Sequence, residues 1–243
     1  MIKKYKEFIV ESNEDIHSIC KKFGIKNFNK QLTVNSDGSI DVDNVVDLRS
    51  KKLTKLPLKF GKVTGNFNCD SNKLTTLEGS PIEVGRDFSC QSNGLTTLNG
   101  SPRIVGSRFD CCDNKLETLE GCPDIIDGNF DCQSNKLTSL KGAPDKVRGN
   151  FYCNNNKLVS FKYLPIASGY DFSGNKIIEF LKYFKNYLDK RNLGLYLRLF
   201  EDIVQFPYLD DLEFEELAKT LKFELPKNWR DSVKSYKMLS KDI

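Results

Sequence analysis

Two stretches of the chain, NFNCDSNKLTTLEGSPIE at residues 66–83 and NFDCQSNKLTSLKGAPDK at residues 129–146, are nearly the same sequence. They are copies of one unit that recurs every 21 residues, as from Phe67 to Phe88. Five residue types keep this step: Phe67, Phe88, Phe109, Phe130, Phe151 and Phe172; Cys69, Cys90, Cys111, Cys132 and Cys153; Asn72, Asn93, Asn114, Asn135 and Asn156; Leu74, Leu95, Leu116, Leu137 and Leu158; and Pro81, Pro102, Pro123, Pro144 and Pro165. Several residue types that repeat at one period predict a solenoid.

In each unit, Phe and Cys alternate with polar residues, which is the pattern of a strand with one buried face. Successive strands of a solenoid pair in parallel about 4.8 Å apart. We expect seven strands, and together they would form a strip roughly 30 Å long. The strands are expected to start near Val46, Asn66, Asp87, Arg108, Asn129, Asn150 and Tyr170.

The Asn of each unit follows the strand, where a buried ladder of Asn side chains can satisfy the amides of the turn. A unit of 21 residues, the interval from Phe67 to Phe88, has no room for a strand and a full helix. The other side of each turn is therefore predicted to be extended or a short 3₁₀ turn, and the Gly-x-Pro sequence fits this. Two end segments, at residues 47–53 and 171–177, are read as lacking two residues after the strand.

The consensus Phe-x-Cys-x-x-Asn-x-Leu-x-x-Leu-x-Gly-x-Pro resembles the leucine-rich repeat pattern L-x-x-L-x-L-x-x-N-x-L, with Phe and Cys in two of the apolar positions. The resemblance covers residues 45–175. This variant is similar to leucine-rich proteins common in tailed bacteriophages. The resemblance implies a mainly β repeat fold, a leucine-rich-repeat solenoid with a parallel concave sheet that binds partners.

The segments on either side of the repeats are predicted to cap them, giving an N-terminal cap at 1–44, a solenoid at 45–176 and a C-terminal α-helical cap or subdomain at 177–243. The N-terminal cap combines a helix that is capped by the run Ser12-Asn13-Glu14-Asp15 and ends at Gly24 with a β-hairpin around Asp37-Gly38. Helical periodicity after Asn175 predicts four helices, near 177–188, 195–204, 214–221 and 229–239.

The composition argues against several classes of function. The chain of 243 residues carries 37 Lys and Arg against 33 Asp and Glu, so its charge of +4 is too small to favour nucleic-acid binding. Its single histidine, His17, leaves few options for acid–base catalysis or a metal site. No signal peptide or membrane-spanning run is recognised. We expect no enzyme activity, no cofactor, no metal, no nucleic acid and no membrane.

The cysteines of the ladder point inward, and we expect them to pack as small hydrophobic residues rather than to bind zinc. Reduced thiols favour a cytoplasmic location, in the host cytoplasm if the protein is phage-encoded. Cys112 alternates outward, so we expect an exposed thiol there.

The outward positions of the strands are the candidate partner-binding surface. Acidic residues outnumber basic ones among them, which suits a basic protein surface and repels phosphates. Arg108 and Tyr152 are the expected anchors, because Arg and Tyr are frequent at binding hot spots. The candidate partner-binding residues are Arg49, Asp70, Asp87, Gln91, Arg108, Asp110, Asp131, Gln133, Tyr152 and Asn154. The alternative is a face that is merely solvated.

Two other patterns leave alternatives open. Lys73, Lys115, Lys136, Lys157 and Lys176 follow the Asn ladder, in a row broken by Gly94. The row could bind an acidic partner or an RNA backbone, or it could prevent self-association of sheets. Residues 35–41 partly resemble a calcium loop, but Thr33 and Asn44 stand where the key carboxylates should be, which favours a plain hairpin.

The leading hypothesis is a non-enzymatic protein–protein interaction module. The phage resemblance implies a host protein as its partner, such as a defence factor that it would sequester or inhibit. One alternative is an effector whose C-terminal region is active, with Tyr183, Tyr187, Glu215, Glu216, Lys219 and Trp229 as the residues to inspect. Another is a virion or assembly component. The oligomeric state is open.

Overall fold

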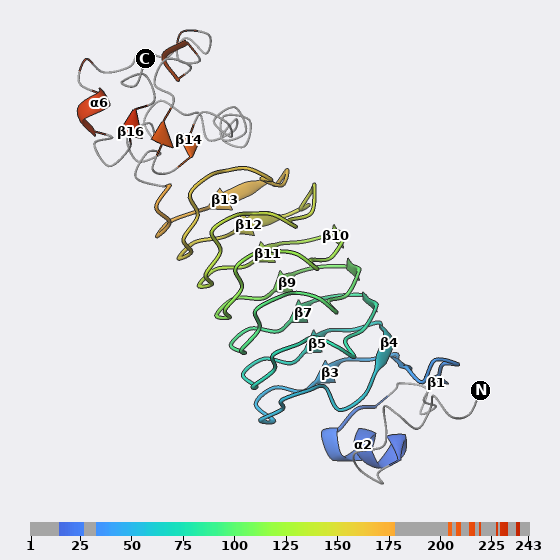
Figure 1. Ribbon diagram of the computed structural model, residues 1–243. Coiled ribbons are helices and arrows are strands. Elements are labelled where there is room, and N and C mark those ends of the chain that lie inside the picture. Colours follow the sequence, from blue (N-terminus) through green and yellow to red (C-terminus); the bar gives the residue numbers. More distant parts are fainter. Residues whose placement is uncertain are drawn as a thin grey trace.

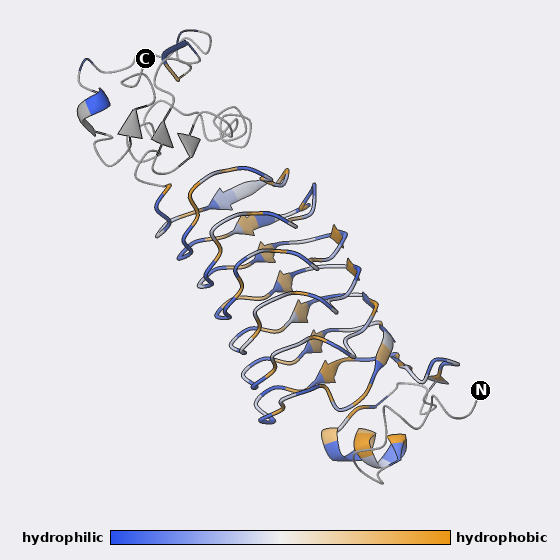
Figure 2. Ribbon diagram, in the orientation of Figure 1, coloured by the Kyte–Doolittle hydropathy of each residue, from blue (hydrophilic) through white to orange (hydrophobic). Residues whose placement is uncertain are grey.

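The computed structural model describes residues 15–26, residues 33–177 and short pieces between residues 204 and 238. Residues 33–177 form a stack of similar turns that run along one axis as an elongated column (Figure 1). Hydrophobic residues recur at the same place in successive turns (Figure 2). The structure is thus a repeat-based β-solenoid in which each turn pairs with the next at the period of the sequence ladders, as they predict.

One side of the column is a parallel seven-stranded sheet of order β13-β12-β11-β9-β7-β5-β3. Its strands are β3 (Val46–Asp47), β5 (Phe67–Asn68), β7 (Phe88–Ser89), β9 (Phe109–Asp110), β11 (Phe130–Asp131), β12 (Asn150–Tyr152) and β13 (Gly169–Asp171). From β5 to β12 the phenylalanine positions align directly, for example Phe88 with Phe109. The seven predicted strands are confirmed.

The other side of most turns is also a strand, which gives a six-stranded sheet of order β1-β2-β4-β6-β8-β10; in the last turns it continues only as isolated bridges at Val147 and Ile166. Its strands are β1 (Thr33–Val34), β2 (Ile40–Val42), β4 (Phe60–Val63), β6 (Glu83–Val84), β8 (Ile104–Val105) and β10 (Ile125–Ile126). The predicted extended backbone is present, but the second sheet was not expected. Leucine-rich repeats carry a helix or 3₁₀ turn there. Here both sides of a turn are strands, so successive turns are separated by the same strand spacing on each side. Equal spacing on the two sides does not make the column curve.

The core lies between the two sheets. The Phe and Cys ladders enter it from the seven-stranded sheet, and Phe67 and Phe88 stack with ring centroids 5.5 Å apart. The six-stranded sheet contributes a second buried ladder, made of Val63, Val84, Val105 and Ile126, and Val147 extends it through an isolated bridge to Ile126. The ladder cysteines are fully buried, and the Sγ of Cys69 lies 3.4 Å from the carbonyl oxygen of Ser89. The predicted packing role of these cysteines is confirmed.

The asparagine ladder has the predicted role. Asn114 is buried, and its Nδ2 donates to the carbonyls of Cys90, Cys111 and Cys112 at 3.0, 3.2 and 3.1 Å. Its Oδ1 accepts from the backbone N–H of Leu95, 3.0 Å away in the preceding turn. The residue before each Asn has a positive φ, such as 53° at Ser92. The side-chain amide thus closes a tight turn and ties it to its neighbour.

The register corrects the reading of both end turns. Val46 aligns with Phe67, and the N–H of Lys73 donates to the carbonyl of Leu53 at 2.8 Å, so the first turn lacks nothing. In the last turn Tyr170, not Phe172, aligns with Phe151. The two missing residues therefore precede β13, and Phe172 takes the place of the ladder cysteine.

At the N-terminal end, α2 (Ile16–Phe23) begins after the N-cap Asp15 and ends at Gly24, which has a φ of 70°. The strands β1 and β2 pair antiparallel around the Asp37-Gly38 turn, so the predicted helix and hairpin are both present. Ile19, Cys20 and Ile25 join the buried cluster that continues into the repeats. Among the described residues, no helix is long and apolar enough to cross a membrane.

The C-terminal pieces differ from the all-helical prediction. The predicted helix at 177–188 and most of that at 195–204 lie outside the described residues. The described pieces include a three-stranded sheet of β14 (Val204–Gln205), β15 (Tyr208–Leu209) and β16 (Lys237–Met238). Helices that end at 204 and 239 are therefore wrong, because β14 and β16 both pair with β15. The short helix α6 (Trp229–Ser232) starts where the fourth helix was expected, and the Trp229 ring packs on Phe214.

Candidate functional site

The outward side chains of the seven-stranded sheet form what we call the polar face. The ladder of inward Phe and Cys side chains determines which residues occupy it, since alternate residues of a strand point to opposite sides. All ten predicted binding residues belong to strands of this sheet or lie within two residues of one. Whether they bind a partner stays a prediction.

Seven of the ten are linked by a continuous set of contacts that crosses the turns. Asp70 accepts from the hydroxyl of Ser89 at 2.6 Å and from the Nε2 of Gln91 at 3.1 Å. The Oε1 of Gln91 in turn accepts from the Sγ of Cys112 at 3.2 Å, and the Cys112 N–H donates to Asp110 at 3.1 Å. Contacts between neighbouring turns, such as those of Gln91 with Asp70 and Cys112, therefore position several of these polar groups.

Arg108 joins the two halves of this network. Its guanidinium Nη2 lies 2.8 Å from the Oδ2 of Asp110 and 2.7 Å from the Oδ2 of Asp131, while its side chain stays 45% exposed. Beyond Asp131 the network continues through Gln133, whose Oε1 accepts from Asn154 at 2.9 Å. A half-exposed cation held by two carboxylates has few free rotamers to lose on binding.

The remaining three candidates are placed separately. Asp87 binds the backbone of the next turn, since its Oδ1 accepts a hydrogen bond from the N–H of Arg108 at 3.0 Å. The hydroxyl of Tyr152 accepts from Asn150 at 2.8 Å. Arg49 forms a two-pronged pair with Asp47 at the N-terminal end of the face, at 2.9 and 2.7 Å.

Burial on this face departs from expectation. Asp70 and Asp131 are each only 5% exposed and Asp110 is 3% exposed, because side chains on adjacent turns cover them. Burial raises the pKa of Asp110, against the lowering effects of its hydrogen bonds to Cys112 and of Arg108. These three carboxylates therefore support their neighbours, and the accessible groups are Arg49, Asp87, Gln91, Arg108, Gln133, Tyr152 and Asn154.

The exposed thiol predicted at Cys112 is wrong. Cys112 does alternate outward, but it is 3% exposed beneath the network. Burial, followed by the hydrogen bond to Asp110, raises its pKa, so the thiol stays protonated at neutral pH. Ser89 and Asn150, which contact Asp70 and Tyr152, occupy outward positions of the repeat but were not among the predicted binding residues.

One group of potential metal ligands, formed by Asp110, Cys112 and Asp131, occurs among the described residues, with ligand atoms within 4.8 Å of one another. Arg108 already contacts both carboxylates, so a bound cation would have to displace it. The thiol is protonated as well, whereas a metal requires a thiolate. These residues are better suited to an ion-pair network than to a metal centre.

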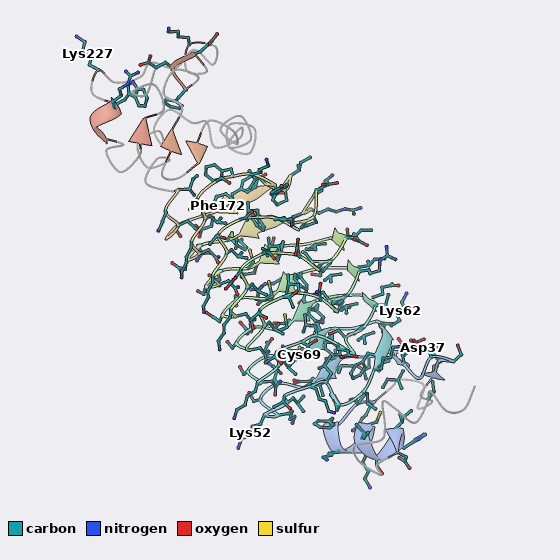
Figure 3. The ribbon with its side chains drawn as sticks, viewed as in Figure 1. Asp37, Lys52, Lys62, Cys69, Phe172 and Lys227 are labelled. Atoms are coloured by element: carbon teal, nitrogen blue, oxygen red, sulfur yellow. The ribbon has the colours of Figure 1, made fainter. Side chains whose placement is uncertain are left out.

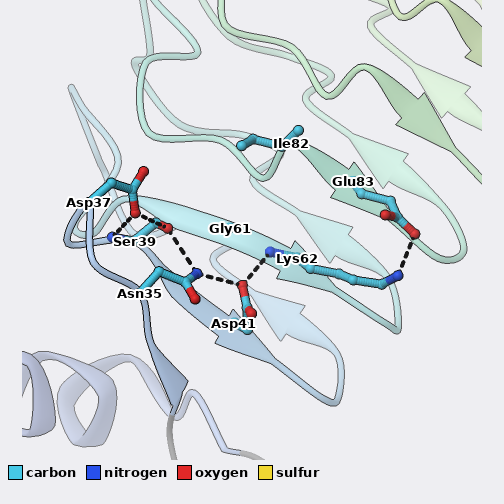
Figure 4. Close-up of a pocket in the computed structure, with 8 residues that line it drawn as sticks. All are labelled: Asn35, Asp37, Ser39, Asp41, Gly61, Lys62, Ile82 and Glu83. Atoms are coloured by element: carbon cyan, nitrogen blue, oxygen red, sulfur yellow. Dashed lines mark hydrogen bonds and ion pairs between the residues drawn. The ribbon is translucent and has the colours of Figure 1, made fainter.

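The segment that partly resembles a calcium loop forms a shallow pocket, lined by Asn35, Asp37, Ser39, Asp41, Gly61, Lys62, Ile82 and Glu83 (Figure 4). Protein donors already occupy its carboxylates. Asp37 accepts from Ser39, and its bond with Lys59 holds the pKa of the carboxyl well below its usual value. Asp41 accepts from the Asn35 Nδ2 at 2.9 Å and from the Lys62 N–H at 2.8 Å. The hairpin interpretation accounts for all these contacts.

The fold and the polar face thus define a two-sheet parallel β-solenoid with an ordered, hydrogen-bonded face on one sheet. No protein-family model matches the chain, and no curated protein or solved structure matches it either.

Proposed function

We propose that this protein is a non-enzymatic binding module whose polar face recognises another protein. The proposal rests mainly on the environment of Arg108, whose side chain is 45% exposed and pairs with the nearly buried carboxylates of Asp110 and Asp131. Gln91 and Gln133 lie on the turns next to Arg108, and Tyr152 and Asn154 lie one turn further along the same face. Arg and Tyr dominate binding hot spots, and an ordered surface loses little entropy on association.

The dimensions of the face bear on the kind of complex. Seven strands at about 4.8 Å extend it over roughly 30 Å, and five residues of each strand region span about 16 Å, which gives on the order of 500 Å². A standard interface uses about 800 Å² on each partner. The partner therefore also contacts the loops beside the face, or the complex is transient.

The chemistry of the face sets the partner's character. Six aspartates (Asp47, Asp70, Asp87, Asp110, Asp131 and Asp171) and two arginines (Arg49 and Arg108) belong to it. Asp70, Asp110 and Asp131 are nearly buried, so they act on a partner through the potential of the face rather than by contact. A protein surface with basic and amide groups complements this arrangement, whereas a phosphate backbone is repelled.

The resemblance to phage repeat proteins extends the proposal to a bacterial host protein, such as a defence factor, that the module sequesters or inhibits. All eight cysteines are free, which supports a reducing compartment such as the host cytoplasm. The leucine-rich repeat relationship itself is part of this proposal, supported by the Asn ladder and the parallel sheet.

Site-specific photo-cross-linking tests the proposal. Tyr152 is replaced by a photoreactive phenylalanine derivative, and a matched variant carries it at Tyr163, which is 48% exposed and lies outside the polar face. In bacterial lysate, we expect a discrete cross-linked protein from position 152 and none from position 163. Cross-linking from position 163 alone would contradict the proposal.

A further inference from the structure

The loops that follow the strands of the seven-stranded sheet carry a second surface, the lysine row, made of Lys52, Lys73, Lys115, Lys136 and Lys157. Each is exposed and occupies the same place in its turn, with Gly94 in the one gap between them. Lys176, in the turn beyond Lys157, continues the line. Figure 3 shows Lys52 and Lys62 pointing away from the column on opposite sides, so the row is separate from the six-stranded sheet.

The backbone holds the row in register. The N–H groups of Lys73, Lys115, Lys136 and Lys157 each donate to a Leu carbonyl of the preceding turn, at 2.8 to 2.9 Å. The turns therefore advance by about 4.8 Å at this edge too, and the row from Lys52 to Lys157 spans about 24 Å.

At four other places on the column, a cation is neutralised by the adjacent turn. Four pairs join residues that occupy the same place in adjacent turns: Lys62–Glu83 at 2.6 Å, Arg103–Asp124 at 2.9 Å, Lys141–Glu120 at 2.9 Å and Arg148–Asp127 at 3.1 Å. In the lysine row, the residue one turn away is another lysine or Gly94. Within the described part of the chain, none of its five lysines forms an ion pair.

Like charges in register repel, so this arrangement costs stability in the isolated protein. Protection of a sheet edge does not explain it, because the backbone groups beside the lysines are already hydrogen-bonded to the next turn. An anionic chain lying along the row would remove the repulsion and pair with every turn.

We propose that the lysine row binds an extended anionic polysaccharide, such as a polyuronate, lengthwise along the column. One uronate unit is about as long as one strand spacing, so its charges can match successive turns. Hydroxyl groups of Ser71, Ser92, Thr75, Thr96 and Thr138 flank the lysines and are exposed to hydrogen-bond sugar hydroxyls. The paired backbone offers no edge for an acidic peptide strand.

The same loops argue against RNA. Residues 50–55, 71–76, 92–97, 113–118, 134–139 and 155–160 contain no aromatic residue and no arginine on which bases could stack. Asp113 and Glu117, their only acidic residues, lie two positions before and after Lys115, so the row is most basic at Lys52 and Lys73 and at Lys136 and Lys157.

The test uses the full chain and a fluorescent oligogalacturonate long enough to span the row. In one variant Lys115, Lys136 and Lys157 are changed to Gln; the matched control changes Lys62, Lys141 and Lys146 to Gln, with the same change in net charge. We expect the first to weaken binding on the order of 100-fold and the control to have little effect. The affinity should also fall as salt rises, with a slope about 3 units shallower in the first variant.

A variant that is expected to bind more tightly completes the test, because misfolding can cause a loss of binding but not a gain. Gly94→Lys fills the gap, and its added Cβ would lie 3.3 Å from the Leu74 carbonyl oxygen, in a place where the other turns already carry Lys. We expect it to bind roughly fivefold more tightly. Absence of oligogalacturonate binding at low salt, equal losses in both triple variants, or tighter row-dependent binding of single-stranded RNA would each overturn the proposal.

Discussion

Replacement of Asn114 by Ala tests the ladder that joins the turns. The structure gives its cost atom by atom. The three carbonyls that accept from Asn114 each keep another donor: the Nδ2 of Asn93 for Cys90, the Nδ2 of Asn135 for Cys111 and the N–H of Ser92 for Cys112. The buried N–H of Leu95 keeps none, because Asn114 is its acceptor.

An orphaned buried donor costs about 2 kcal/mol, and the weakened carbonyl bonds add about 1 kcal/mol together. Asn114→Ala should therefore lower the free energy of unfolding by about 3 kcal/mol, a large share of an ordinary domain's stability. Asn72→Ala is a graded comparison. The Oδ1 of Asn72 accepts from the N–H groups of Lys51 and Leu53, which are exposed or half-buried, so water can replace it at a cost of about 1 kcal/mol.

Urea unfolding followed by far-UV circular dichroism measures these costs, since the single Trp229 lies outside the repeats. Asn99→Ala, at an exposed position, serves as the control and should change stability by less than about 0.5 kcal/mol. If Asn114→Ala cost less than about 1 kcal/mol, or no more than Asn72→Ala, the ladder would not hold the turns together as described.

Three further predictions concern charge, pH and packing. Arg108→Gln leaves Asp110 and Asp131 without their cation and should lower the free energy of unfolding, measured in urea, by about 2 kcal/mol. This loss of stability should become smaller as the pH falls towards 4, because the raised pKa of Asp110 allows its carboxyl to become neutral. A loss that is independent of pH would contradict this. Burial raises the pKa of the thiols of Cys69, Cys90, Cys111 and Cys132, so the folded state keeps protons that the unfolded state releases above pH about 8.5. Under reducing conditions, the free energy of unfolding should therefore fall by about 1.4 kcal/mol per thiol at one pH unit above that value. In Cys111→Ala this decrease should be smaller by the contribution of one thiol. Constant stability between pH 7.5 and 9.5 would refute it. Phe109→Ala, which empties a fully buried site between Phe88 and Phe130, should lower the urea midpoint by an amount equivalent to about 4 kcal/mol, and a loss below about 2 kcal/mol would show that the aromatic ladder is not close-packed.

The repeat pattern was sufficient to predict the seven-stranded sheet, because Phe and Cys alternate with polar residues in most of the turns. It did not predict the second sheet, whose strands are only two residues long in β6, β8 and β10. A two-residue strand buries a single side chain and shows no alternation. Its signal was instead the ladder of Val84, Val105 and Ile126, which keeps the period of the repeat.

Residue type alone also misplaced the last turn. Phe172 stands one full period after Phe151, yet Tyr170 occupies the aligned position. Both residues are large and aromatic, so the sequence fits either register. The hydrogen bond from the Cys153 N–H to the Asp171 carbonyl, 2.8 Å long, decides between them.

For the candidate site, the sequence predicts which side chains point outward but not which of them remain accessible. The burial of Asp70, Asp110 and Asp131 results from longer side chains on adjacent turns, such as Gln91 and Arg108. Such sideways contacts depend on rotamers and register together. The same contacts make Cys112 a buried member of the network rather than an exposed thiol.

The central functional claim is that the polar face binds a partner protein, and the most direct test compares two matched triple variants. In one, Gln91, Gln133 and Asn154 become Ala; in the other, the exposed Ile82, Ile104 and Ile125, outside the polar face, become Ala. The affinity of the partner recovered by cross-linking is measured by calorimetry for both. We expect the affinity to fall by about tenfold or more in the first variant and to change very little in the second. The reverse pattern would contradict this claim.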